Sequence, residues 1–216
     1  MRKIDRVYRE ILHRFYSKGE RFFNQKQLSE VCEISLGTIN PLINKLEIFG
    51  AIERKPQGFR LIDPKRALIS WAVTRDLAED ITYTTFVPAP LEELEGKLPR
   101  GSVLTAYSGY RVRFGTTPAE YNQVFVYAEA EEMQRAFKPT MRKRRNLIVL
   151  QPDVHLKRLS SNGAAPVVQL YVDLWQLGKP ASRFVEELEN KILSPHTRAL
   201  GEVARTFKGA NESSRV

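Results

Sequence analysis

Apolar residues recur every three or four positions at the start of the chain. Those of residues 2–15 fall on one side of a helix: Ile4, Val7, Tyr8, Ile11, Leu12 and Phe15. This spacing matches the 3.6-residue turn of an α-helix, so it predicts an amphipathic helix from Arg2 to Phe15. Ser17-Lys18-Gly19 follows, and a glycine after the last periodic residue predicts that the helix ends there.

The same spacing predicts two further helices before residue 50. Asn24 is a candidate N-cap for a short helix over Gln25–Cys32, and Glu33-Ile34-Ser35 is a tight connection to the next helix. That helix turns its apolar residues inward: Ile39, Leu42, Ile43 and Leu46. Either Ser35 or Thr38 is its expected N-cap.

Pro41 narrows the expected start of this third helix. A proline deep inside a helix costs about 3 kcal/mol, so Pro41 belongs in the first turn and the helix begins near Gly37 or Thr38. Its free face then carries Thr38, Asn40, Asn44 and Lys45. Asparagine pairs with adenine through two hydrogen bonds, and threonine packs against the thymine methyl group. With Ser35, these residues form a candidate surface for the DNA major groove. The alternative is a solvated polar face used for protein contacts.

Two short strand patterns follow the third helix. Ala51–Lys55 and Phe59–Ile62 flank Pro56-Gln57-Gly58, which predicts a β-hairpin. Three helices followed by a hairpin predict a winged helix-turn-helix domain over residues 1–80. The hairpin supplies the other candidate DNA-binding residues: Arg54, Lys55, Gln57 and Arg60. Cations at such a site suit either a clamp on backbone phosphates or entry into the minor groove. The alternative is a solvated edge whose charges resist aggregation.

Residues 63–200 predict a connecting helix and then a second domain. Asp63-Pro64 begins a helix that runs toward Glu79, and this helix either links the domains or packs against a second copy of itself. Residues 81–200 read as a mixed α/β domain, which makes the whole chain α+β. Residues 201–216 are expected to be a flexible tail.

The elements of the second domain follow from apolar runs and periodicity. Four runs are expected to be strands: Ile81–Val87, Val124–Tyr127, Leu147–Leu150 and Val167–Trp175. Three segments are expected to be helices: Pro90–Leu98, Glu131–Phe137 and Ser182–Leu193. Val103–Phe114 reads either as a strand or as a small pair of helices.

Charge is unevenly spread along the chain, whose net charge is +9. Residues 1–75 hold 15 Lys or Arg and 8 Asp or Glu (15 − 8 = +7); residues 76–137 hold 5 and 10 (5 − 10 = −5); and residues 138–216 hold 14 and 7 (14 − 7 = +7). Two basic segments around an acidic one favour a polyanionic partner, and double-stranded DNA is the expected one.

A second basic element lies at Arg142, Lys143, Arg144 and Arg145. It reads equally as a phosphate-binding patch and as an exposed loop.

The cysteine and hydropathy patterns bear on the compartment. Cys32 is the only cysteine, so no disulfide can form within the chain, and its apolar position predicts a packed core thiol. No apolar run reaches the roughly 18–20 residues needed to span a bilayer. The N-terminus lacks the pattern of a secretory signal. These features predict a cytoplasmic protein that does not use a membrane as a partner.

Catalytic motifs are weak, and neither a cofactor nor a metal is expected. His13, His155 and His196 share no metal-ligand spacing. Asp173 follows an apolar run, but no acidic-x-Lys element accompanies it, so we read it as a hydrogen-bonded residue at a strand end. We therefore expect no enzyme activity. The competing hypotheses are a DNA-targeted nuclease or nucleotidyltransferase-like enzyme, and a protein-interaction module in replication or repair.

Short motifs resemble two kinds of regulator. Ser35-Leu36-Gly37-Thr38-Ile39-Asn40 and Gly50-Ala51-Ile52-Glu53-Arg54 resemble the run found in winged-helix regulators. The second half is similar to the C-terminal domain of AbiEi-type antitoxins from type IV toxin–antitoxin systems. This likeness lies in Tyr83-Thr84-Thr85-Phe86, Thr105-Ala106-Tyr107-Ser108-Gly109 and residues 166–174.

The resemblance implies an autoregulator that binds its own promoter, as a dimer or as paired monomers. It also implies a cognate toxin similar to a nucleotidyltransferase. Where such antitoxins often carry a turn rich in glycine and arginine, this chain has Gly178-Lys179-Pro180-Ala181-Ser182.

Overall fold

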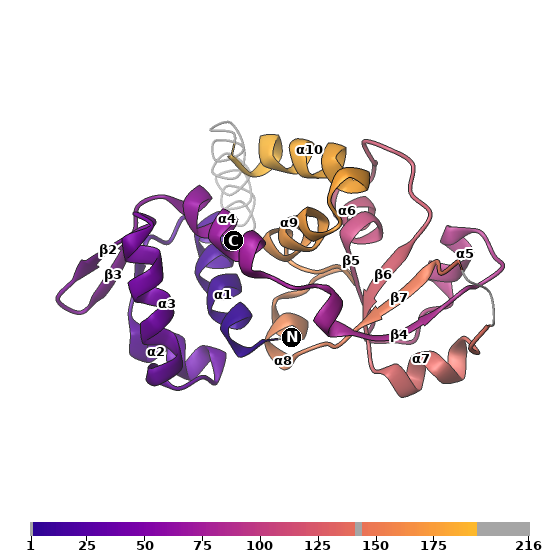
Figure 1. Ribbon diagram of the computed structural model, residues 1–216, viewed down its shortest axis with the longest axis horizontal. Helices are drawn as coiled ribbons and strands as arrows, with labels where there is room; N and C mark the ends of the chain where they lie inside the picture. The colour runs from indigo at the N-terminus through magenta and orange to yellow at the C-terminus, as the bar shows by residue number, and fades with distance from the viewer. Residues whose placement is uncertain (1, 141–143, 194–216) are drawn as a thin grey trace, which may run out of the picture.

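The chain combines helices with two small β-sheets, so the expected α+β class is confirmed (Figure 1). The computed structural model describes residues 2–140 and 144–193. A three-stranded sheet lies at one end of the molecule, a four-stranded sheet lies toward the other, and helices fill the space between them. Cys32 is buried at 0% exposure in that interior, as its apolar position predicts.

The first three helices lie close to their predicted positions. Helix α1 spans Lys3–Lys18, α2 spans Gln25–Cys32 and α3 spans Leu36–Ile48. Asn24 caps α2 with its side chain, as expected. Helix α3 begins earlier than predicted, and Pro41 lies inside it rather than in its first turn. A proline there removes only its own bond to the carbonyl of Gly37, and that carbonyl lies at the solvent-facing start of the helix.

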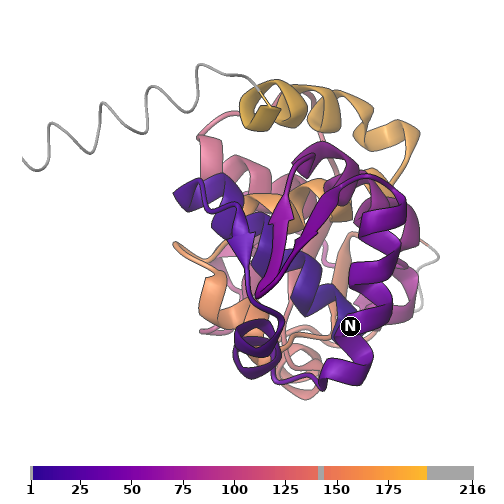
Figure 2. The same cartoon turned by 90° about the vertical axis from the view of Figure 1, so that its left-hand side faces the viewer.

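The first sheet is antiparallel and has the order β1-β3-β2. Strands β2 (Ile52–Lys55) and β3 (Gly58–Leu61) form the predicted hairpin, and β1 (Phe22–Phe23) pairs with the outer edge of β3. Gly58 lies so close to β1 that a Cβ there would come within 2.1 Å of the carbonyl oxygen of Phe23. The hairpin points away from the rest of the molecule in Figure 1 and faces the viewer in Figure 2.

Helix α4 spans Pro64–Thr74 and leads toward the second sheet. The carboxylate of Asp63 caps it, as the Asp-Pro pair predicts. The helix ends before the predicted Glu79 because Arg75 adopts an extended backbone. A short 3₁₀ turn, η1 (Ala78–Asp80), follows at the predicted domain boundary near residue 80.

The second sheet is mixed and has the order β4-β7-β6-β5. Its strands are β4 (Ile81–Thr85), β5 (Val103–Thr105), β6 (Val124–Tyr127) and β7 (Leu147–Leu150). Strands β6 and β7 are parallel, whereas the other pairs are antiparallel. The remaining elements are α5 (Leu91–Gly96), α6 (Ala106–Phe114), α7 (Ala130–Ala136), α8 (Val154–Leu159), α9 (Val167–Gln176), η2 (Lys179–Ala181) and α10 (Ser182–Leu193).

Helix α9 corrects the prediction of a strand over Val167–Trp175. The segment is buried on nearly every side, with 0% exposure at Leu170, Val172 and Asp173. Its polar residues Gln169, Asp173 and Gln176 recur at spacings of four and three, which is a helical period, so the strand prediction followed the apolar run and passed over this signal. Asp173 consequently lies within a helix and not at a strand end.

Val103–Phe114 is neither of the two predicted alternatives but a strand followed directly by a helix, β5 and α6. The turn between them places Ala106 in the left-handed region at φ 48°. Gly109 lets the helix approach the strand, because a Cβ there would lie 2.8 Å from the carbonyl oxygen of Leu104. The backbone at this turn is therefore tightly constrained.

Two clusters of buried apolar side chains hold the molecule together. The larger cluster runs from α1 and α4 through α9 to α6, α10 and one face of the second sheet. The smaller cluster packs α5 and α7 against the opposite face of that sheet. The N-terminal helices thus share a core with one face of the second sheet.

Candidate nucleic-acid interface

The free face of α3 carries three exposed, uncharged polar side chains: Thr38, Asn40 and Asn44. Four inward residues of the same helix, Ile39, Leu42, Ile43 and Leu46, are buried as predicted and fix this orientation. Ser35 occupies the N-cap position, but its hydroxyl lies 3.0 Å from the Thr38 hydroxyl and caps no backbone N–H. Hydroxyl and amide groups therefore line the start and middle of this face.

Arg54 ties the hairpin to α3. Its Nε donates to the Glu47 carboxylate at 2.7 Å, and another guanidinium nitrogen donates to the Asn44 side-chain oxygen. In the strand register Arg54 lies opposite Phe59, so the two side chains share one face of the hairpin. Phe59 is buried, and this face therefore turns toward the helices. The Arg54 charge is thus shared with a carboxylate, and Asn44 is already a hydrogen-bond partner within the surface.

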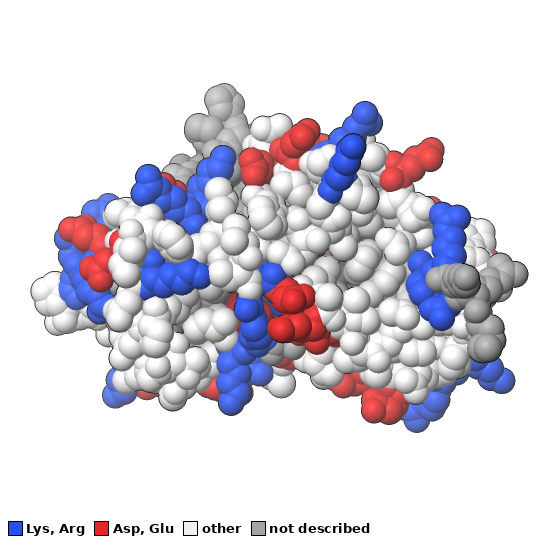
Figure 3. Space-filling view, viewed as in Figure 1, with Lys and Arg blue, Asp and Glu red and all other residues white. Residues whose placement is uncertain are grey.

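The other face of the hairpin carries the remaining cations. Arg60 lies opposite Glu53 on β2 and opposite Phe22 on β1, and Phe22 is 48% exposed. Lys55 forms an ion pair with Glu53 at 2.7 Å. Within the described residues, no hydrogen bond or ion pair engages the guanidinium of Arg60. Basic and acidic groups therefore alternate at this end of the molecule, as Figure 3 shows.

Asn24 joins the start of α2 to the turn of the hairpin. Its side-chain oxygen accepts from the backbone N–H groups of Lys26 and Gln27 at 2.8 and 3.2 Å. Its amide nitrogen donates to the carbonyl oxygen of Gln57 at 2.8 Å. The sequence predicts the cap but gives no sign of the second bond. The Gln57 side chain is exposed at the tip of the hairpin.

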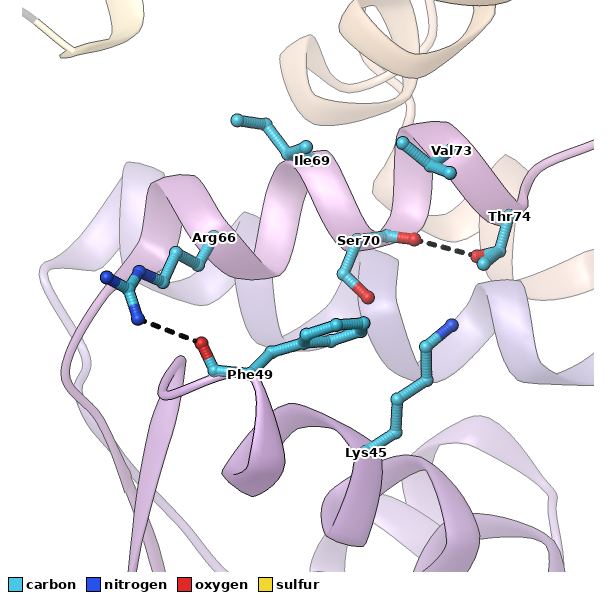
Figure 4. A pocket seen from close by; sticks show the side chains of 7 residues that line it. All are labelled: Lys45, Phe49, Arg66, Ile69, Ser70, Val73 and Thr74. Carbon is cyan, nitrogen blue, oxygen red and sulfur yellow. Dashed lines mark hydrogen bonds between the residues drawn. The ribbon is translucent and has the colours of Figure 1, made fainter.

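Lys45 lies apart from the other predicted contact residues. Its side chain is partly buried and passes over the Phe49 ring, with Nζ 5.6 Å from the ring centroid. It lines an open groove of about 400 Å³ between the end of α3 and helix α4 (Figure 4). The predicted α3 surface is therefore divided: Thr38, Asn40 and Asn44 face solvent, whereas Lys45 turns toward α4.

The second predicted basic patch is only partly described. Arg144 is exposed and Arg145 is partly buried, whereas Arg142 and Lys143 lie outside the described residues. The backbone carbonyl of Arg145 accepts a bond from the Gln123 side chain at 3.3 Å, which ties this loop to the start of β6.

Sequence reasoning missed a buried polar network around Asp173. Its carboxylate accepts from Thr105 and Tyr127 at 2.7 and 2.8 Å, and from Gln169 at 2.9 Å. Burial raises the pKa of Asp173, and the guanidinium of Arg75, 3.4 Å away, partly offsets this effect. Asp173 is closed to solvent at 0% exposure, so its carboxylate faces the interior and not an outside substrate.

Arg75 links this network to the N-terminal helix. Its guanidinium contacts Asp5 of α1 at 3.2 Å and Asp80 at 2.6 Å, and all of these side chains are buried. Burial opposes the charge of Arg75, yet Tyr127 and the surrounding carboxylates outweigh this and raise its pKa. Residues from α1, the end of α4, β6 and α9 therefore meet in a single buried cluster.

Arg9 makes a second set of buried contacts with the C-terminal half. Its Nε donates to Gln169 at 2.8 Å, and its Nη1 lies 3.1 Å from Asp153 and 3.0 Å from Nδ1 of His155. An arginine can only donate, so Nδ1 of His155 must accept, and the ring is neutral with its proton on Nε2. That Nε2–H donates to Glu10 at 2.8 Å.

The pKa shifts of His155 and Glu10 agree with a neutral His155 ring that donates to Glu10. Burial lowers the pKa of His155, as the neutral ring requires. Burial alone would raise the pKa of Glu10, but hydrogen bonds from His155 and Arg14 outweigh it and lower the pKa to about 2. Burial raises the pKa of the Cys32 thiol to about 12, so at neutral pH it remains a packed thiol.

Across residues 2–140 and 144–193, no three or more His, Cys, Asp and Glu side chains are grouped so that they could hold a metal ion. In the same part of the chain, no helix is both long enough and apolar enough to cross a membrane.

Comparisons of the chain with protein-family models, with curated proteins and with solved structures found no match.

Proposed function

We propose that the chain binds double-stranded DNA in a sequence-specific manner and regulates transcription. In this proposal residues 1–80 form a winged helix-turn-helix domain. Helix α3 enters the major groove, and the β2–β3 hairpin contacts the neighbouring backbone. Residues 81–200 form the domain that binds a partner or senses an effector.

The exposed polar face of α3 carries the proposal. Thr38 and Asn40 are exposed and uncharged, and their helix is fixed from behind by buried apolar residues. Groups of this kind suit the edges of bases, since asparagine can bond adenine twice and threonine can contact the thymine methyl group. A face meant only for solvation would not need a rigid helix directly beside a basic hairpin.

The hairpin supports the same proposal through its position. Asn24 holds its turn against α2, and Arg54 holds its body against α3. When a hairpin is held at a fixed angle to the helix in the major groove, it meets the DNA backbone beside that groove. Arg60 is the cation best placed for a phosphate, because no carboxylate of the described residues pairs with its guanidinium.

Substitution of Asn40 and Arg60 tests base reading separately from phosphate contact. Duplexes selected from a random pool by the full chain would be compared with unselected duplexes. Asn40→Ala should weaken binding to the selected sequence about 5- to 150-fold more than binding to unselected DNA, because one bidentate base contact is worth about 1–3 kcal/mol. Arg60→Ala should weaken both alike and lower the slope of log affinity against log salt by about one unit.

Arg100→Ala is the matched control, because Arg100 is an exposed arginine outside the first three helices and the hairpin. It removes the same charge and should leave both affinities nearly unchanged. Equal losses on all sequences from Asn40→Ala would refute base reading. Absence of duplex binding by the full chain at low ionic strength would refute the proposal as a whole.

The predicted role of the C-terminal half rests on the resemblance to AbiEi-type antitoxins. We propose on that basis that the regulated promoter is the protein's own. A cognate nucleotidyltransferase-like toxin and a cytoplasmic location stay predictions.

A further inference from the structure

A band of apolar side chains lies open to solvent along α4. Val73 is 59% exposed and Ile69 is 37% exposed, although the opposite side of the helix is buried against the core. Phe49 and Ile62 flank the band and are about half exposed (49% and 47%). The groove of about 400 Å³ beside α4 runs along this band (Figure 4). Apolar surface that clusters in this way marks an interaction site.

The exposed residues follow the spacing of a helix that pairs with another helix. Within α4, Arg66, Ile69 and Val73 are separated by 3 and 4 positions, and Ile62 and Asp76 lie just before and just beyond the helix. A spacing of three and four is that of the seam of a coiled coil, in which every third or fourth residue meets the partner. A second helix is therefore the occupant whose shape best fits the band.

Charges at the two ends of the seam specify whether that second helix runs parallel or antiparallel to α4. Arg66, at the start of α4, has 62% of its side chain exposed, and Asp76 is exposed just beyond the end of the helix. Figure 3 shows uncharged surface along α4, with basic groups toward its start and acidic groups past its end. A parallel copy would put like charges together, whereas an antiparallel copy would put Arg66 beside Asp76 at both ends.

We propose that two copies of this chain form a dimer by packing their α4 helices antiparallel about a two-fold axis. The axis crosses the exposed face of α4 midway along the helix between Ile69 and Val73. Ile69 of each copy then contacts Val73 of the other, and Arg66 of each copy pairs with Asp76 of the other. A surface that is complementary to itself in this way is what a two-fold interface requires. The proposal does not depend on DNA binding.

The interface is small, and this sets what an experiment should observe. A stable interface buries about 800 Å² on each partner, whereas the seam offers a few apolar side chains with charges at its rim. The dimer should therefore form at high protein concentration, dissociate on dilution and weaken as salt screens its ion pairs. Sedimentation equilibrium of the full chain measures each of these effects.

Charge reversal tests the pairing directly. Arg66→Asp alone and Asp76→Arg alone each place like charges at both ends of the seam, so each variant should dimerise at least tenfold more weakly than the wild type. An equal mixture of the two variants restores both opposite-charge pairs and should form heterodimers. Asp76→Ser is a further variant, because a serine can still cap the backbone N–H groups of Ala78 and Glu79 that Asp76 now caps, but carries no charge.

The apolar centre is tested by Val73→Asp, which should abolish the dimer. Val154→Asp is its matched control, since Val154 is a similarly exposed valine (68%) on α8, and it should dimerise like the wild type. Circular dichroism confirms that each variant is folded. A wild-type chain that stays monomeric at high concentration would overturn the proposal, as would a mixture of the two charge variants that stays monomeric. In either case the band would belong to a different partner.

Discussion

At the scale of single residues, His155 shows how geometry fixes a protonation state. The ring is neutral because Arg9 offers only N–H groups to its Nδ1. Its Nε2–H donates to the carboxylate of Glu10, so both ring nitrogens are used. A second proton on the ring would face the Arg9 guanidinium with no acceptor. The contact between α1 and α8 is therefore sensitive to acid.

This arrangement predicts a loss of stability on mild acidification. Burial lowers the pKa of His155 below its ordinary 6.5 in the folded chain, so the unfolded chain binds the proton more readily. The free energy of unfolding should be constant above pH 6.5 and should fall as the pH drops below it. A second fall is expected as the pH drops from about 4.5 to 2, because the pKa of Glu10 is lowered to about 2.

His155→Gln isolates the first of these losses, since a glutamine amide can still donate to Glu10 but does not titrate. Urea unfolding at pH 8, 7, 6 and 5 should show a flatter pH dependence for this variant than for the wild type. Burial also lowers the pKa of His13, so His13→Gln should remove a separate part of the slope. Identical pH dependence in wild type and His155→Gln would contradict the neutral ring.

At the scale of elements, the reliable sequence signals were local ones. The cap at Asn24 and the Asp63-Pro64 start each act within one turn of a helix, and both were predicted correctly. The α9 helix was predicted as a strand from its apolar run, although Gln169, Asp173 and Gln176 keep a helical spacing. The second bond of Asn24 was invisible to sequence, since its partner Gln57 lies 33 residues away.

Asn24 should therefore contribute in two separable ways. Asn24→Ala removes the cap and the bond to the hairpin, and it should lower the free energy of unfolding by about 1–2 kcal/mol. Asn24→Asp keeps the acceptor for the backbone N–H groups but has no donor for the carbonyl of Gln57, so most of the stability should remain. Hydrogen exchange of residues 54–60 should quicken in both variants. Unchanged exchange in Asn24→Asp would show that the bond to Gln57 does not hold the hairpin.

At the scale of the whole molecule, the buried network joins segments far apart in the chain. Arg75 and Asp173 are separated by 98 positions, and Arg9 and Gln169 by 160. No local pattern in the sequence signals such pairs, which is why this cluster was missed. Because its members come from both sides of the predicted boundary near residue 80, the two halves should unfold together.

Arg75→Met tests this coupling. It leaves Asp5, Asp80 and Asp173 buried without their shared cation, and removal of one partner from a buried ion pair typically costs about 3–5 kcal/mol. Urea unfolding should show a single transition at a much lower midpoint. Arg100→Met, at an exposed arginine outside the network, is the control and should change stability by less than about 0.5 kcal/mol. A loss below about 1 kcal/mol in Arg75→Met would mean that the network contributes little.

The close approach of β3 to β1 has a consequence for how this chain can diverge. The exposed polar groups of α3 stand in water, so descendants of the chain can exchange them freely. Position 58 has no such freedom, because any side chain there would collide with the carbonyl oxygen of Phe23 unless β1 moved. Among distant descendants that keep this sheet, a glycine at that point should outlast every exposed polar residue of α3.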